Sequence, residues 1–238
     1  MVEQEGQHPE VLHTPSARSI RELVFGVNDG LVSVTAIVMG VTGARLTSHD
    51  IVISGLSAVT AATVSMGLGA YLSTVAENEY FLAELRREEQ EVETVPDEER
   101  REVEAIYRAQ GFTKEDTLRL TDHVTADHKR WIAFMMREEL GILVDSMDSP
   151  WHNAWVMAVA VILGSLPPMV PYVLLSNSHT AMTVAIVLAC LAAFSLGVLK
   201  ARIGRGNWLR SGLQFVLVTA AAVAVGIAAG HLFRGLFQ

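Results

Sequence analysis

The hydrophobic residues of this 238-residue chain are concentrated in five long runs, which are separated by polar connections of very different length. The runs cover residues 23–44, 51–75, 154–175, 181–199 and 212–231. A helix needs about 20 apolar residues to cross a bilayer core about 30 Å thick, so each run is long enough for one span. The pattern predicts an all-α integral membrane protein with five transmembrane helices.

The longest polar stretch, residues 76–153, is predicted to be helical as well. Residues 76–94 continue the second apolar helix in helix-favouring Glu, Ala, Leu and Arg. We expect Pro96 and Asp97 to end that helix and to cap the next one. Two more helices are expected at about 115–124 and 128–143. The chain then divides into a tail (1–22), two spans (23–75), a helical domain (76–153) and three spans (154–238).

The acidic residues are gathered in this helical domain. It holds 20 of the 26 Asp and Glu but only 10 of the 18 Lys and Arg, so its net charge is −10 and that of the remaining chain is +2. A strongly acidic domain favours a cation as partner and argues against nucleic acid.

The basic residues of the short connections predict the orientation. The links between the first and second runs and between the third and fourth runs, which lie on one side, contain only one Lys or Arg, Arg45. On the other side, the tail and the link between the fourth and fifth runs carry Arg18, Arg21, Lys200, Arg202, Arg205 and Arg210. Lys and Arg accumulate on the cytoplasmic side, so we expect the N-terminus and the acidic domain in the cytoplasm and the C-terminus outside. The first 20 residues lack an apolar stretch, so no cleavable signal peptide is expected.

Asp29 is the only acidic residue inside any of the five runs. An ionisable side chain in hydrocarbon costs about 2.5 kcal/mol or more, and it commonly marks an ion or proton pathway. Met66 in the second run lies at a similar depth, counting about 1.5 Å per residue, so the two side chains could hold one ion together. The alternatives are an Asp29 satisfied by a neighbouring helix and a Met66 that fills a packing gap.

Seven side chains of the acidic domain form a candidate metal site. Two Glu pairs are spaced three residues apart, and two Met and one Glu lie within about one turn, so each set shares a helix face. The residues are Glu88, Glu91, Glu99, Glu102, Met135, Met136 and Glu139. Carboxylate oxygen combined with thioether sulfur points to first-row transition metals rather than Mg²⁺ or Ca²⁺. Spacing alone also fits an ordinary solvated helix face. Glu77 and Glu79, near the membrane boundary, could form an electrostatic funnel for cations.

Stripes of small residues predict close helix contacts in the membrane. Gly26 and Gly30 are four residues apart in the first run, and Gly226 and Gly230 repeat that spacing in the last one. The second run carries a similar stripe of Ala61, Ser65 and Gly69. Small residues let membrane helices approach closely, although glycine in the last span could also be merely tolerated. Three prolines, Pro167, Pro168 and Pro171, are expected to kink the third span or to end it early.

Four ordered motifs resemble the vacuolar iron transporter family over almost the whole chain. They are Phe-Gly-Val-Asn-Asp-Gly-Leu-Val-Ser (25–33), Ser-Met-Gly-Leu-Gly-Ala-Tyr-Leu (65–72), Phe-Met-Met-Arg-Glu-Glu-Leu-Gly (134–141) and Leu-Pro-Pro-Met-Val-Pro-Tyr (166–172). The resemblance implies a homodimer of five-helix subunits with a cytoplasmic metal-binding domain. It also implies export of Fe²⁺, and of ions such as Mn²⁺, Co²⁺ and Zn²⁺, in exchange for protons.

The resemblance also implies roles for single residues. The family's Glu pairs and its Met-Met-x-x-Glu group fall on the seven residues of the candidate metal site, and its path-lining Asp and Met fall on Asp29 and Met66. Plant and parasite members carry a Glu two turns before that Met, where this chain has Ala58. Asp29 is then the sole carboxylate there to balance the ion and to exchange protons. The short chain and its Arg- and Ala-rich composition favour a bacterial inner membrane.

Other functions fit the sequence less well. Di-iron carboxylate enzymes use paired Glu-x-x-His motifs, and the only match is Glu10 to His13 in the tail, so we do not expect an enzyme. No Gly-x-x-x-x-Gly-Lys-Ser/Thr loop for ATP is present, which disfavours a primary pump. A passive channel for divalent metals, or a membrane-tethered metal-binding or sensing protein, remains as the alternative.

Overall fold

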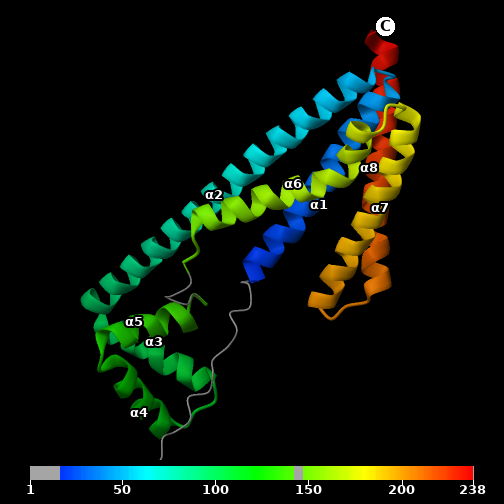
Figure 1. The fold of residues 1–238 in the computed structure, drawn as a ribbon. Helices are drawn as coiled ribbons and strands as arrows, with labels where there is room; N and C mark the ends of the chain where they lie inside the picture. Colours follow the sequence, from blue (N-terminus) through cyan, green and yellow to red (C-terminus); the bar gives the residue numbers. More distant parts are fainter. Residues whose placement is uncertain (1–16, 142–146, 238) are drawn as a thin grey trace, which may run out of the picture. The chain divides into compact units, whose positions relative to one another are not determined.

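The computed structural model describes residues 17–141 and 147–237 of the chain. These residues form eight α-helices and no strand (Figure 1). The helices are α1 (Ala17–Gly43), α2 (Ser48–Thr94), α3 (Pro96–Ala109), α4 (Lys114–Thr125), α5 (His128–Glu138), α6 (Pro150–Leu174), α7 (Ser178–Ile203) and α8 (Trp208–Phe237). The predicted all-α class is confirmed. Residues 1–16 of the expected tail, and residues 142–143 at the end of the expected last polar helix, lie outside the described residues.

Five of these helices are long and apolar enough to span a membrane. They are α1, α2, α6, α7 and α8, which correspond in order to the five predicted runs. The chain divides into two compact units. We call Met1–Tyr71 with Trp151–Gln238 the membrane unit, and Leu72–Pro150 the acidic unit. The helix α2 contributes its first part to the membrane unit and its last part to the acidic unit.

The helix α2 runs without interruption for 47 residues, which confirms that the polar residues 76–94 extend the second span. At 1.5 Å per residue its length is about 70 Å. The break comes at Val95, whose N–H donates to Glu91 O at 2.8 Å, and α3 begins with Pro96. The expected capping by Asp97 is wrong, because Val95 occupies the N-cap position without a side-chain hydrogen bond. Asp97 lies instead in the first turn, where its negative charge interacts favourably with the positive end of the helix dipole.

Glycine brings helix backbones into contact inside the membrane unit. A Cβ atom added at Gly30 would collide with Val161 O of α6, and one added at Gly164 would collide with Val27 O of α1. A Cβ atom at Gly230 of α8 would likewise collide with Gly40 O of α1. The close contacts predicted for the Gly26–Gly30 and Gly226–Gly230 stripes are therefore confirmed, because only glycine fits at such a distance.

A stripe of buried alanines in α7 was not predicted from the sequence. Ala181, Ala185, Ala189 and Ala193 repeat at four-residue spacing and are all completely buried. The first two pack with Val34, Val38 and Met39 of α1, and the last two pack with Leu31 of the same helix. The α1 helix, which carries Asp29, therefore packs against α6, α7 and α8.

The three prolines of α6 do not end this span early. The helix continues through Pro167, Pro168 and Pro171 to Leu174. Proline has no N–H, so the carbonyls four residues before each proline receive no backbone hydrogen bond. Such groups are tolerated in membrane helices where neighbouring helices enclose them, and α6 is half buried along its apolar part.

The apolar part of α2 is far more exposed, with 17% of it buried against 50% for α6. Its small residues Ala61, Ser65 and Gly69 are all exposed, and a Cβ atom at Gly69 would meet nothing within 4 Å. The predicted close helix contact of this stripe is therefore not made within the described part of the chain.

The acidic unit packs α3, α4 and α5 against the end of α2 around its own apolar core. The core residues are Phe81, Val92, Val103, Val124, Trp131, Ile132, Phe134, Met135 and Met136. Arg100 of α3 forms an ion pair with Asp122 of α4 and donates to Thr125 Oγ1 at 2.9 Å. This unit therefore has the apolar core and the cross-links needed to position charged side chains on its surface.

Candidate metal and translocation sites

Five carboxylates of the acidic unit lie within electrostatic range of one another. We call them the acidic cluster: Glu88 and Glu91 of α2, Glu99 and Glu102 of α3, and Glu139 at the C-cap of α5. The packing of α2, α3 and α5 around the shared core brings these three elements together. The turn at Val95 contributes by folding the first turns of α3 back onto the end of α2. All five belong to the predicted metal site.

Glu88 has the most perturbed carboxyl group of this cluster. It is only 4% exposed, and its Oε1 atom is buried without a hydrogen-bond partner. Burial, followed by repulsion from Glu99, Glu139, Glu91 and Glu102, raises the pKa of Glu88 to about 7. A carboxyl group in these surroundings keeps its proton near neutral pH unless a cation replaces it.

Two further carboxyl groups of the cluster have the same tendency. Burial and the charges of Glu102, Glu91 and Glu139 raise the pKa of Glu99, and a side-chain hydrogen bond with Glu88 lowers it in part. Burial and the charges of Glu102 and Glu91 raise the pKa of Glu139. The cluster therefore concentrates negative charge that no group within it neutralises.

Arg87 is the nearest cation, and the sequence prediction did not include it. Its Nε atom donates to Glu91 Oε1 at 3.1 Å, and its Nη1 atom lies 3.9 Å from Glu84 Oε2. The positive charge of Arg87 also offsets part of the rise in the pKa of Glu139. The four-residue spacing of Arg87 and Glu91 on one helix was the available signal. Because the Arg87 side chain is 67% exposed, its pairing with Glu91 is weak and reversible.

Met135 and Met136 lie in the core of the acidic unit and are both 0% exposed. They pack with Val92, Val103 and Phe134 in the same apolar cluster. Ordinary packing accounts for this burial, because methionine fills irregular gaps in cores. A ligand role for the two sulfur atoms therefore stays a prediction.

The oxygen atoms of the acidic cluster are not arranged as a closed coordination shell. In the described parts of the chain, no three His, Cys, Asp or Glu side chains converge closely enough to hold one metal ion. Glu102 and Glu139 are exposed and Glu91 is half-buried, so these side chains have room to change rotamer. Convergence on one ion requires such rotation, and the positive charge of the ion would then offset the repulsion among the carboxylates.

Asp29 is half-buried on α1 in the membrane unit. Ser33, one turn later on the same helix, donates its Oγ hydrogen to Asp29 Oδ1 at 3.2 Å. Among the described residues no Lys, Arg or His forms an ion pair with Asp29. The sequence prediction overlooked Ser33, although the four-residue spacing offered the signal. The backbone contacts at Gly26 and Gly30 hold this segment of α1 against α6.

The other predicted path residues lie on α2. Met66 and Ala58 are both half-buried in the membrane unit. No hydrogen bond or ion pair in the described residues joins Met66 to Asp29. Glu77 and Glu79 are exposed on the part of α2 that belongs to the acidic unit. The proposed roles of Met66 in coordination, and of Glu77 and Glu79 in a funnel, stay predictions.

Five apolar helices of spanning length define an integral membrane protein, and one of them, α1, carries Asp29 in its apolar part without a basic partner in the described residues. The sequence profile of the VIT family matches residues 20–231, so the chain belongs to this family. The resemblance recognised from the four motifs is thereby confirmed.

Relatives from plants and parasites cover most of the chain. Vacuolar iron transporter 1 of Arabidopsis thaliana is 30% identical over 217 residues, which are 91% of this chain and 87% of that protein. Vacuolar iron transporter 1 of Oryza sativa subsp. japonica is 31% identical, covering 93% of this chain and 88% of that protein. The vacuolar iron transporter of Toxoplasma gondii is 31% identical, with coverages of 96% and 79%. These names are those of transporters and not of enzymes, as expected.

Proposed function

We propose that this protein exports Fe²⁺ from the cytosol in exchange for protons, with Mn²⁺, Co²⁺ and Zn²⁺ as further candidate ions. The relatives named as iron transporters support iron as the substrate. The observation that carries the proposal is Asp29, a half-buried carboxylate in a spanning helix with no ion pair in the described residues. A carboxylate in that position can hold either a cation or a proton, which is the property that an exchanger needs.

The first proposed step is capture of the metal by the acidic cluster. Because the pKa of Glu88 is about 7, its carboxyl group is partly protonated near neutral pH, and a divalent cation binds there by displacing a proton. Exposed Glu102 and Glu139 rotate toward the ion, and Met135 and Met136 supply sulfur if the core opens to them. Glu77 and Glu79 form the funnel that guides the ion onward.

The second proposed step takes the ion across the membrane. Deprotonated Asp29 receives it with help from Met66, and Ser33 keeps the carboxylate oriented through its hydrogen bond. Release on the far side is linked to reprotonation of Asp29, so an acidic exterior would drive export. Because Ala58 replaces the second carboxylate of plant and parasite members, Asp29 alone carries the proton exchange.

The proposed setting is a homodimer in a bacterial inner membrane. The N-terminus and the acidic unit face the cytoplasm, and the C-terminus lies outside. The basic residues Lys200, Arg202, Arg205 and Arg210 between α7 and α8 support this orientation. The exposed small-residue face of α2 supports contact with a second copy.

A passive channel is the second candidate, and the absence of a carboxylate at Ala58 favours it. An acidic vestibule and one intramembrane Asp would suit a channel equally well. The two functions differ in one measurable property, since only an exchanger moves the metal uphill at the expense of a proton gradient.

The deciding experiment measures Fe²⁺ flux into proteoliposomes with and without an imposed proton gradient, for the wild type and for Asp29→Ala. We expect gradient-driven flux in the wild type and at least a 100-fold loss in the variant. Ser33→Ala removes the hydrogen bond but keeps the carboxylate, so it should lose less flux than Asp29→Ala. Retained flux in Asp29→Ala would contradict the proposed path, and flux indifferent to the gradient would indicate a channel.

A further inference from the structure

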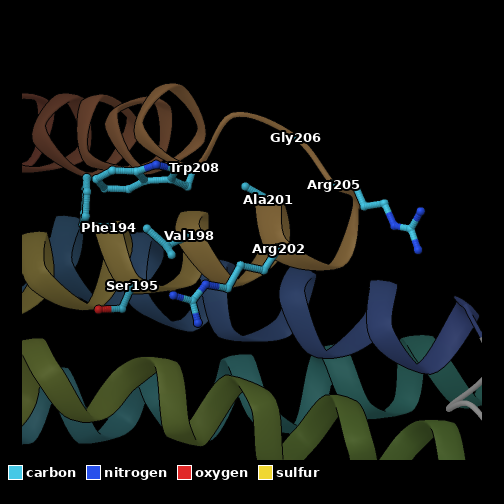
Figure 2. A pocket seen from close by; sticks show the side chains of 8 residues that line it. All are labelled: Phe194, Ser195, Val198, Ala201, Arg202, Arg205, Gly206 and Trp208. Atoms are coloured by element: carbon cyan, nitrogen blue, oxygen red, sulfur yellow. The ribbon is translucent and has the colours of Figure 1, made fainter.

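The turn between α7 and α8 borders an open cavity of about 680 Å³ that the proposed transport path does not use. Its lining combines cationic, aromatic and hydroxyl side chains from the end of α7, the connecting turn and the first residue of α8 (Figure 2). The residues that matter here are Phe194, Ser195, Val198, Arg202, Arg205 and Trp208.

The side chains in this cavity are arranged as a cationic part and an aromatic part. Phe194 and Trp208 meet edge to face, with ring centroids 6.2 Å apart and planes at 86°. Figure 2 shows Arg202 reaching back along α7 toward Ser195, while Arg205 extends outward from the turn. The backbone of Arg205 is left-handed, with φ of 50°.

The chain segment that forms α6, α7, α8 and this turn supplies no negative charge to balance the two arginines. Residues 149–238 contain no Asp or Glu at all, yet this segment holds Lys200, Arg202, Arg205 and Arg210. Among the described ion pairs none involves these residues, and Lys200 lies over the ring of Phe215 at 5.7 Å instead. The cavity is therefore a cationic site within an apolar pair of spanning helices, and its chemical complement is an anion.

We propose that this cavity binds the phosphate group of an anionic phospholipid. Guanidinium groups match the geometry of phosphate oxygens and form charge-assisted hydrogen bonds with them. Tryptophan side chains occur typically at the level of lipid headgroups, and Trp208 is 55% exposed at the start of α8. Basic pockets between membrane helices are known to suit such headgroups.

The apolar surroundings favour a lipid over a free phosphate ion. Val198 and Phe194 continue the cavity along α7 toward the apolar middle of the helix. Leu199 and Leu209 beside the turn are 46% and 48% exposed. A phospholipid can place its phosphate at Arg202 and its acyl chains along these apolar residues, and the exposed Arg205 side chain can reach that phosphate only by changing its rotamer. Inorganic phosphate gains nothing from the apolar residues.

Native mass spectrometry of the purified full-length protein tests this proposal. Phosphatidylglycerol and phosphatidylcholine are titrated separately, and the dissociation constants of the first lipid adducts are compared. We expect tighter binding of phosphatidylglycerol, and a loss of about fivefold in its affinity for each of Arg202→Gln and Arg205→Asn. Asn suits position 205 because it tolerates a left-handed backbone.

Arg45→Asn is the matched control. Arg45 is also an exposed arginine with a left-handed backbone, φ 59°, and it lies in the turn between α1 and α2. Its substitution therefore removes the same charge and makes the same backbone change at a turn away from the cavity. It should leave the affinity for phosphatidylglycerol unchanged. Equal affinities for the two lipids, or equal losses in all three variants, would overturn the proposal. Displacement of phosphatidylglycerol by glycerol phosphate at similar concentration would also overturn it, by assigning the cavity to a soluble anion.

Discussion

At pH 7 the buried carboxyl group of Glu88 is about half protonated, because its pKa is about 7. A divalent cation that binds beside it must compete with this proton. The same side chain should therefore affect two quantities, the metal affinity that we propose for the acidic cluster and the stability of the acidic unit without metal. Because the pKa is raised, the metal affinity should increase as pH rises, and the stability without metal should decrease.

The stability of the metal-free acidic unit should fall as pH rises. The folded state holds the Glu88 proton more tightly than the unfolded state, whose pKa is near 4.5. The resulting stabilisation is complete below pH 4.5 and is lost as pH rises through 7, and Glu99 and Glu139 shift in the same direction. A shift of this size corresponds to at most roughly 3 kcal/mol.

Glu88→Gln should remove most of this pH dependence, because glutamine keeps the shape and cannot ionise. Hydrogen exchange of the full-length protein, corrected for intrinsic rates, gives the opening free energy of peptides from residues 84–104 between pH 5 and 8. Glu98→Gln is the control, since Glu98 is exposed on α3 and forms an ion pair with Arg101. If the wild type and Glu88→Gln had the same slope against pH, the assignment of the proton to Glu88 would be wrong.

Metal capture should depend on Glu99 and Glu102 as ligands and not merely as charges. We expect Glu99→Ala with Glu102→Ala to weaken Mn²⁺ or Co²⁺ binding to the full-length protein at least about tenfold, measured by isothermal titration calorimetry at pH 7.5. Each carboxylate is an oxygen ligand of the kind these metals accept. The affinity of the wild type should also rise with pH between 6 and 8, since binding displaces protons.

A control pair removes two charges outside the cluster. Glu98 and Glu115 are exposed carboxylates of the acidic unit, paired with Arg101 and Arg119. Glu98→Ala with Glu115→Ala should change the affinity by about twofold or less, because exposed charges are screened by salt. Equal losses in the two double variants would show that the acidic unit attracts metal only through its overall charge.

At the scale of the helices, backbone contact through glycine fixes the position of α1. Gly164 of α6 faces Val27 O so closely that even an alanine side chain would force the helices apart. We expect Gly164→Ala to destabilise the membrane unit by about 1 to 3 kcal/mol and to lower the thermal unfolding temperature of the detergent-solubilised protein. Gly235→Ala in α8 is the control, because a Cβ atom there meets nothing within 4 Å. Similar effects of the two substitutions would contradict the close α1–α6 contact.

Elements with a local signal were predictable from the sequence. The five spans follow from hydropathy, and the long α2 follows from helix-forming residues up to Pro96, which lacks the N–H needed to continue the helix. The burial of Ala181 and Ala185 was not predictable, because alanine is common in spans whether it is buried or exposed. The same four-residue spacing of small residues predicted close helix contact in two spans, but only one prediction was right. Gly226 and Gly230 pack on α1, whereas a Cβ atom at Gly69 would meet no atom within 4 Å among the described residues.

The sequence indicated which carboxylates of the candidate site share a helix face, but it did not indicate their protonation. The three-residue spacing of Glu88 and Glu91 placed both on one face, and the fold adds α3 and α5 to that face. The raised pKa of Glu88 depends on its burial, which no local pattern encodes. The complete burial of Met135 and Met136 depends equally on the core that α2 and α3 complete.

At the scale of the whole molecule, the exposed face of α2 is the surface through which we expect the proposed homodimer to form. Most of its apolar part has no partner in the described chain, and large side chains such as Leu68 and Leu72 are 55% and 65% exposed. Lipid can cover such residues without cost, because the hydrophobic effect does not drive helices together inside a bilayer. The small residues Ala61, Ser65 and Gly69 among them are the feature that favours a second protein surface.

Gly69→Leu and Ser65→Leu should therefore shift the proposed homodimer toward monomers, because each fills space that a second α2 needs for close approach. We expect the dimer dissociation constant in detergent to rise at least about tenfold, measured by fluorescence exchange between two labelled populations. Leu56→Phe is the control, since it enlarges an exposed side chain of α2 away from the small stripe. If all three variants dissociated like the wild type, the dimer would have to form through another face, and the small residues of α2 would serve only the packing of lipid.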